Sequence, residues 1–254
     1  MELSEREWKL VSLGAFDELR KEVQDRPDVL EFINKGTEHV SDIELFKKRY
    51  GYKHDVALDF PPEYLAGFTL DERLETILGL IKKYNAKTVL DIGSRAGYLL
   101  FAGMKKCIIK SAVGVELDTS YHNLCQRAKH FFNFPNIDFH NIMFEEFHTE
   151  EKFDAIVIAD VLEHTIDPLG IIKKTLGMIK ETGVLIISVP VDRPPVSPEE
   201  KTTMMLWTQQ EHVHLLTLEK LKSIATQAGY NHIETMTLSG GWKIDISSFK
   251  PSTK

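Results

Sequence analysis

The pattern of apolar and polar positions changes near residue 87. From there to about residue 190, short apolar runs alternate with amphipathic stretches of helical period. This alternation predicts strands joined by crossover helices, and therefore a parallel sheet. The expected strands are 87–92, 112–116, 136–141, 154–159 and 183–189, and the expected helices are 97–107, 119–132 and 168–180.

Local signals refine these boundaries. Asp167 followed by Pro168 is a typical helix start, and Gly183 is the expected end of the same helix. A further capped helix is expected at 217–228. Two strands at about 231–237 and 242–248 are then predicted to add an antiparallel hairpin to the sheet.

The segment before the alternating region has a different pattern. Residues 1–68 show helical stripes without intervening strands, so we expect a helical N-terminal cap followed by a core domain at 69–254. Thr69, with Glu72 three residues later, is expected to cap the helix that leads into the core. Residues 190–216 contain four prolines and then an apolar stretch, which indicates a lid loop.

Composition narrows the function classes. The 254 residues are 43% hydrophobic and 27% charged, with a formal net charge of −7, and no apolar run reaches the length of a membrane span. A negative chain is a poor partner for nucleic acid, which is bound mainly through cationic groups. Cys107 and Cys125 lack metal-site spacing and are expected to be buried small hydrophobes. Together with an N-terminus that lacks a signal-peptide core, this predicts a cytoplasmic protein.

A glycine-containing turn follows the first expected strand, where residues 88–99 read TVLDIGSRAGYL. A strand, a glycine turn and a helix are typical of a nucleotide-type site at the carboxyl edge of a parallel sheet. No glycine lies two residues after Gly93, so the dinucleotide pattern fails, and Asp91 would repel a pyrophosphate but suits an amino group. Glu116 ends the next strand, where a carboxylate can accept both hydroxyls of a ribose. Glu116 suits NAD and S-adenosylmethionine alike, whereas the glycine spacing and Asp91 disfavour NAD.

Further motifs follow the fourth expected strand. Residues 153–164 read FDAIVIADVLEH, Asp167-Pro168-Leu169 comes next, and residues 180–190 read KETGVLIISVP. With the glycine turn, these motifs resemble the class I S-adenosylmethionine (SAM)-dependent methyltransferases over about residues 70–248, and especially their subgroup with a V-L-E-H signature. The resemblance implies a Rossmann-like, doubly wound seven-stranded α/β sheet with an antiparallel last strand. The chain departs from the family at Arg95, where a glycine is usual.

The resemblance also implies a SAM site at the carboxyl edge. Asp91 would face the ammonium group of the methionine part, Glu116 the ribose and Leu117 the adenine, while Arg95 would either swing out or pair with the SAM carboxylate. The implied cofactor-binding residues are Asp91, Gly93, Arg95, Gly97, Glu116, Leu117, Met143, Phe144, Ala159 and Asp160.

The chemistry of methyl transfer suggests the catalytic candidates. The sulfonium methyl is already activated, so the protein mainly aligns the acceptor and excludes water. An alcohol acceptor also loses a proton, for which histidine is the usual base near neutral pH. The candidates are His164, His212 and His214, and for each the alternative is a purely structural hydrogen bond.

A metal site is a second interpretation of the same region. Asp160, Glu163 and His164, together with His212 or His214, offer oxygen and nitrogen ligands for a divalent metal. This set is similar to that of small-RNA 3′-terminal 2′-O-methyltransferases and of some ubiquinone-pathway O-methyltransferases. We do not favour the metal, because many enzymes with V-L-E-H bind none.

The sequence therefore predicts a SAM-dependent methyltransferase that acts on an oxygen of a small molecule such as a sugar, a quinone or a natural-product intermediate. One alternative is a metal-dependent RNA 2′-O-methyltransferase. The other is a catalytically silent SAM-fold binding protein, for which Arg95 is the one supporting feature. The oligomeric state is not predicted.

Overall fold

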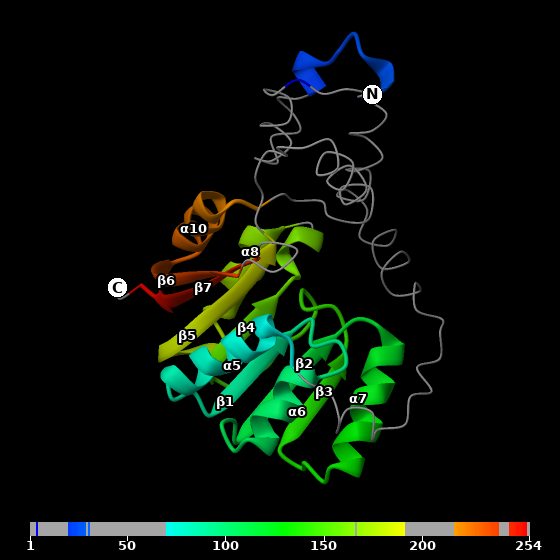
Figure 1. Cartoon of the computed structure of the whole chain (residues 1–254), viewed down its shortest axis with the longest axis vertical. Helices are drawn as coiled ribbons and strands as arrows, with labels where there is room; N and C mark the ends of the chain where they lie inside the picture. Colours follow the sequence, from blue (N-terminus) through cyan, green and yellow to red (C-terminus); the bar gives the residue numbers. More distant parts are fainter. Residues whose placement is uncertain are drawn as a thin grey trace.

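The computed structural model describes residues 4, 20–28, 30, 70–165, 167–190, 216–238 and 244–252. A seven-stranded sheet forms the centre of the described core, with helices packed against it (Figure 1). Of the expected N-terminal cap, helical turns at 20–22 and 27–28 are described. The boundary at residue 68 and the lid at 190–216 stay predictions, because nearly all of these residues lie outside the described part.

The sheet has the order β3-β2-β1-β4-β5-β7-β6. Its first five strands pair in parallel, and β7 runs antiparallel to both β5 and β6. The strands are β1 (Thr88–Ile92), β2 (Ser111–Glu116), β3 (Ile137–Asn141), β4 (Phe153–Ala159), β5 (Ile179–Pro190), β6 (Tyr230–Leu238) and β7 (Ile244–Pro251). The predicted seven-stranded sheet with its antiparallel last strand is confirmed.

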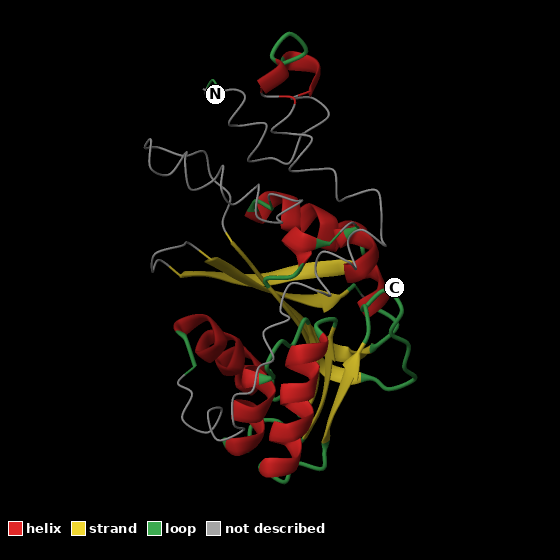
Figure 2. Ribbon diagram, turned by 90° about the vertical axis from the view of Figure 1, so that its right-hand side faces the viewer, coloured by secondary structure: helices red, strands yellow, loops and turns green. Residues whose placement is uncertain are grey.

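Helices cover both faces of the sheet (Figure 2). Apolar residues of α5, α6 and α7 belong to one buried cluster, and those of α8 and α10 belong to a second cluster on the opposite face. The helices are α5 (Glu72–Lys83), α6 (Tyr98–Lys105), α7 (Thr119–Phe131), the short 3-10 turn η2 (Leu162–His164), α8 (Pro168–Thr175) and α10 (Leu218–Gln227). None of these described helices has the length and apolar character needed to cross a bilayer.

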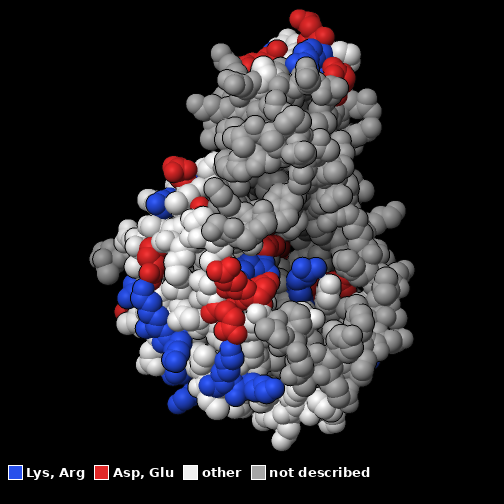
Figure 3. Space-filling view, in the orientation of Figure 1, with Lys and Arg blue, Asp and Glu red and all other residues white. Residues whose placement is uncertain are grey.

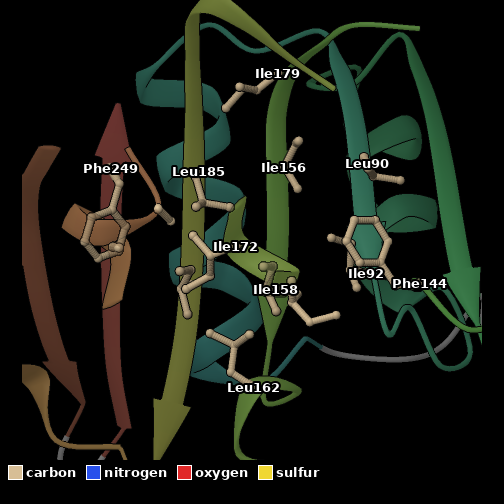
Figure 4. Packing of buried hydrophobic residues seen from close by; sticks show 14 of the residues in the cluster. Leu90, Ile92, Phe144, Ile156, Ile158, Leu162, Ile172, Ile179, Leu185 and Phe249 are labelled. Carbon is tan, nitrogen blue, oxygen red and sulfur yellow. The ribbon is translucent and has the colours of Figure 1, made fainter. Parts of the chain in front are cut away.

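The second cluster follows one face of the central strands (Figure 4). Leu90 and Ile92 of β1, Ile156 and Ile158 of β4 and Leu185 of β5 are all at most 2% exposed. Alternate residues of the same strands, such as Val89 and Val157, belong to the first cluster. Strands buried on both faces explain why these runs are apolar throughout.

The N-caps set where the helices begin, and one differs from expectation. Asp71, rather than Thr69, caps α5, because its side chain accepts a hydrogen bond from the Leu74 amide at 2.8 Å. Asp167 caps α8 as predicted and accepts from the Gly170 amide at 2.8 Å. A short polar side chain at this position satisfies a backbone donor that the helix leaves open.

The prediction for residues 168–183 was wrong at its C-terminal end. Helix α8 stops at Thr175, and β5 begins at Ile179, which pairs with Phe153. Gly183 therefore lies inside a strand, next to an irregularity at which the register shifts between Phe153 and Ala155. Long-range strand pairing has overridden the local helical pattern.

The two cysteines differ from each other. Cys125 on α7 is buried as expected, whereas Cys107 is exposed and follows the end of α6. The expectation that both are buried was wrong for Cys107, which has a positive φ of 55° in the turn toward β2.

Candidate active site

A cavity of about 710 Å³ opens at the carboxyl ends of β1, β2 and β4. It lies at the point where the strand order reverses, since β1 is flanked by β2 on one side and by β4 on the other. Open α/β sheets bind ligands at this crevice. The predicted site residues that line it are Asp91, Gly93, Arg95, Glu116, Leu117, Met143, Phe144, Ala159, Asp160 and His164.

The two glycines of the turn have different surroundings. Gly93 lines the cavity with φ 72°, and a Cβ there would approach Val161 Cγ2 to 2.4 Å. Gly97 does not line the cavity. With φ 71°, it caps α6 where a Cβ would lie 2.9 Å from the Phe101 ring and 3.0 Å from the Phe139 ring. Gly97 thus allows close packing behind the turn.

Glu116, at the end of β2, is held in a fixed position. One carboxylate oxygen accepts from the backbone N–H of Arg95 and the other from that of Asp118, each at 2.7 Å. The side chain is buried, and burial raises its pKa while the two amide hydrogen bonds oppose that rise. Each oxygen retains a lone pair, so a rigid acceptor pair faces the cavity.

Asp91, at the end of β1, is a nearly isolated charge. It is 4% exposed, and no residue in the described part of the chain donates a hydrogen bond to its carboxylate. Burial raises the pKa of Asp91 to about 7, the negative charge of Glu116 adds to the rise, and Arg73 opposes it. A buried carboxylate without a donor is suited to a cationic ligand.

Arg73 on α5 was missed by the sequence analysis. Its guanidinium forms an ion pair with Asp160, whose other oxygen accepts from Ser188 Oγ at 2.8 Å. Burial raises the pKa of Asp160, and the Arg73 charge opposes that rise. Arg73 and Asp160 are 87 residues apart in sequence, and nothing in the local pattern around Arg73 indicates that α5 carries a cation to this cavity.

The Arg95 side chain lies against Tyr121 of α7. Its guanidinium carbon lies 5.4 Å from the centre of the Tyr121 ring, and its Nη2 lies 3.5 Å from the Tyr121 hydroxyl. Arg95 and Tyr121 both line the cavity, and pairing of Arg95 with the SAM carboxylate stays a prediction.

The catalytic and metal candidates are described in part. His164 lines the cavity at the end of η2, with its Nε2 4.0 Å from the nearest carboxylate oxygen of the buried Glu163. His212 and His214 lie outside the described residues. Within the described residues, no group of three histidine, cysteine, aspartate or glutamate side chains could hold a metal ion. The three described members of the alternative metal set, Asp160, Glu163 and His164, therefore form no such group, and Asp160 is instead paired with Arg73.

Solved structures of methyltransferases share this architecture. An N-methyltransferase, NodS from Bradyrhizobium japonicum WM9 in complex with S-adenosyl-L-homocysteine, covers 85% of this chain and 96% of its own, with a TM-score of 0.55 and 19% identity. Magnesium protoporphyrin IX methyltransferase (ChlM) from Synechocystis PCC 6803, with bound SAM, covers 84% and 99%, with a TM-score of 0.60 and 12% identity. At these identities the likeness establishes the fold.

Sequence comparison is more specific. Ubiquinone biosynthesis O-methyltransferase from Histophilus somni (strain 2336) is 31% identical over 154 residues, which are 58% of this chain and 62% of the relative. The enzyme of the same name from Glaesserella parasuis serovar 5 (strain SH0165) is 31% identical over 156 residues. The chain thus matches about three fifths of these relatives' length. A family model described as a methyltransferase domain matches residues 64–235, which is more than half of the chain, so the chain belongs to the methyltransferase-domain family.

Proposed function

We propose that this protein is a SAM-dependent methyltransferase that methylates an oxygen of a small molecule. The observation that carries the proposal is the placement of Asp91 and Glu116, two buried carboxylates at the ends of adjacent parallel strands in one cavity. One lacks a hydrogen-bond donor among the described residues and suits a cation. The other is fixed by two amides and suits a pair of hydroxyls. SAM carries both groups.

The rest of the cavity fits the same ligand. Leu117, Met143 and Phe144 supply an apolar surface next to Glu116, where an adenine ring would lie. At the other end, Arg73 and Asp91 offer opposite charges of the kind that an α-amino acid presents, and a guanidinium is well matched to a carboxylate. Gly93 lets the Val161 side chain pack directly against the turn, where a Cβ would clash with it.

The transfer step belongs to the end of β4. When bound, SAM supplies a methyl group already activated by its sulfonium. His164 lies at this edge of the cavity and, in this proposal, accepts the proton that an acceptor hydroxyl loses. Asp160 holds Arg73 through an ion pair, and Ser188 Oγ donates to the other oxygen of Asp160, so both charged groups are fixed at this edge of the cavity.

A small-molecule acceptor agrees with the names of the relatives, the ubiquinone biosynthesis O-methyltransferases. The net charge of −7 favours it over nucleic acid, as do the interspersed acidic and basic side chains on the described part of the face in Figure 3. Membership of the V-L-E-H subgroup and a cytoplasmic location are part of the proposal. The second rests on two free cysteines, as expected in a reducing compartment.

Calorimetric titration tests the cofactor. The full chain should bind SAM or S-adenosylhomocysteine and not NAD. Glu116→Ala removes the group that accepts the ribose hydroxyls, so it should weaken that binding at least about thirtyfold. This loss of affinity corresponds to about 2 kcal/mol. Glu150→Ala, an exposed carboxylate outside the cavity, is the matched control. NAD binding, or an unchanged affinity in Glu116→Ala, would contradict the assignment.

Turnover tests the proposed base. With a catechol or quinol acceptor that the wild-type protein methylates, His164→Ala should lower kcat by about 10²–10⁴-fold while SAM affinity stays within about twofold. Retention of wild-type kcat would exclude His164. Loss of activity with a chelator would instead favour the metal-dependent alternative.

A further inference from the structure

Arg95 occupies a backbone conformation that costs an arginine more than a glycine. Its φ is 46°, in the left-handed region. Its side chain is exposed, so burial of that side chain does not compensate for the unfavourable backbone conformation. Residues with a Cβ adopt this region rarely. The conformation has a visible use, because it points the Arg95 amide at Glu116. A glycine could supply the same amide, so the guanidinium requires a separate explanation.

The Arg95 side chain extends across the rim to α7. The guanidinium lies against the Tyr121 ring, 5.4 Å from its centre, and both residues line the cavity. Tyr121 is in the first turn of α7, and its amide donates to the N-cap Asp118 at 3.2 Å. The amide of Asp118 in turn donates to Glu116. Arg95 and Tyr121 are thus tied to Glu116 from two sides.

These contacts place the pair at one end of the cavity. Arg95 and Tyr121 border the carboxylate of Glu116, whereas Arg73 forms its ion pair with Asp160 and influences Asp91. Among the described residues that line the cavity, Arg73 influences Asp91 of β1 and Arg95 donates its amide to Glu116 of β2. The proposed function assigns the amino-acid carboxylate of the cofactor to Arg73.

We infer that Arg95 and Tyr121 form a clamp that binds the nucleoside part of the cofactor, and not its amino-acid part. The inference rests on the proposed function. A planar guanidinium on an aromatic ring makes a rigid wall. Such a wall limits water around Glu116 and strengthens the hydrogen bonds that its oxygens offer to a ribose. The pair acts as a positioning device and takes no part in the transfer itself.

Two ligands separate the nucleoside from the amino acid. S-adenosylhomocysteine contains both parts, whereas 5′-methylthioadenosine contains the nucleoside and lacks the amino acid. We expect Arg95→Ala and Tyr121→Ala each to weaken binding of both ligands by about tenfold in calorimetric titration. Arg73→Gln should instead affect the two ligands unequally, with a larger loss of affinity for S-adenosylhomocysteine than for 5′-methylthioadenosine. Arg127→Ala, an exposed cation of α7 outside the cavity, is the control.

Two further variants separate binding from folding. Arg95→Gly removes the same guanidinium but relieves the backbone, so it should bind as weakly as Arg95→Ala while melting at the same temperature or higher. The double variant Arg95→Ala/Tyr121→Ala should bind about as weakly as either single variant, because the two side chains act as one unit. Tyr121→Phe keeps the ring and should lose less affinity than Tyr121→Ala.

Each contrary result is distinct. Unchanged affinity in both alanine variants would reduce the pair to surface packing and overturn the clamp. A loss confined to S-adenosylhomocysteine would place Arg95 at the amino-acid end and overturn the assignment to the nucleoside. If the wild-type protein bound neither ligand, the proposed function itself would fail, independently of Arg95.

Discussion

Asp91 is a carboxyl group whose environment opposes its charge. Burial and the nearby Glu116 raise its pKa to about 7, so at neutral pH the free protein is a mixture of protonated and ionised Asp91. An ammonium group binds the ionised form. Below pH 7 the ligand must therefore displace a proton, and linkage then requires the affinity to fall as the pH falls.

The first prediction is a pH profile of cofactor binding. Between pH 8.5 and 7 the dissociation constant for S-adenosylhomocysteine should change little, and below pH 7 it should rise toward tenfold per pH unit. Calorimetry across pH 5.5–8.5 measures this. Asp91→Asn should bind more weakly and lose most of the slope, because it has no proton to release. A steep profile retained in Asp91→Asn would assign the titration to another group, such as Glu116, whose pKa is also raised.

At the residue scale, sequence reasoning found the groups that belong to motifs. Asp91, Glu116 and Asp160 each follow or end an apolar strand, and parallel strands bring such ends together. Arg73 and Tyr121 were missed because each lies on a helix, where a polar residue normally indicates an exposed face. That these two face the cavity is decided by how α5 and α7 pack, which no short pattern records.

At the element scale, the sheet shows what local patterns do and do not determine. Asp167 and Pro168 marked the start of α8 correctly, because a cap is a local interaction. The end of α8 was misplaced because it depends on a distant partner. Ile179 pairs with Phe153, and the Lys180 Nζ donates to Asp154 at 2.8 Å. These contacts extend β5 back through Gly183, the residue that had indicated a helix end.

Gly183 and Gly79 give an element-scale prediction with opposite signs. A Cβ at Gly183 would lie 2.6 Å from Ile179 Cγ1 and 2.9 Å from the Lys180 carbonyl oxygen, whereas nothing lies within 4 Å of a Cβ at Gly79. Gly183→Ala should destabilise the protein by roughly 1–3 kcal/mol through overpacking. Gly79→Ala, at an exposed position inside α5, should stabilise it by roughly 0.5–1 kcal/mol.

Urea unfolding of both variants measures the difference. Each alanine removes the same backbone freedom from the unfolded chain, so the comparison isolates the folded-state contacts. Equal shifts in the two variants would mean that β5 tolerates a side chain at Gly183.

At the scale of the whole molecule, ionised Asp91 in the cavity lowers the free energy of unfolding. The apolar clusters on both faces of the sheet must compensate for that loss. Asp91 binds a proton more tightly in the folded protein than in the unfolded chain, where a carboxyl group titrates near its ordinary value of 3.8. Its contribution to stability is therefore most favourable below pH 4. That contribution falls as the pH rises toward 7 and is unfavourable by its full amount above pH 7. Asp154 has the opposite behaviour. Hydrogen bonds from Lys180, Lys87 and Thr88 lower its pKa to about 2, so its stabilising effect is lost only in acid.

The last prediction follows from the difference between these two carboxylates. Without ligand, Asp91→Asn should be more stable than the wild-type protein at pH 8 by roughly 2–4 kcal/mol, since about three pKa units of unfavourable ionisation are removed. The difference should shrink as the pH falls and nearly vanish below about pH 3, where Asp91 is protonated in both the folded and the unfolded protein. Asp154 is common to both proteins and cancels. Saturating S-adenosylhomocysteine should reverse the order at pH 8, because it stabilises the wild-type protein more than the variant. If the variant is instead less stable than wild type at pH 8 without ligand, the Asp91 carboxylate has a stabilising partner in the free protein. Asp91 would then not be an unmatched charge in the cavity.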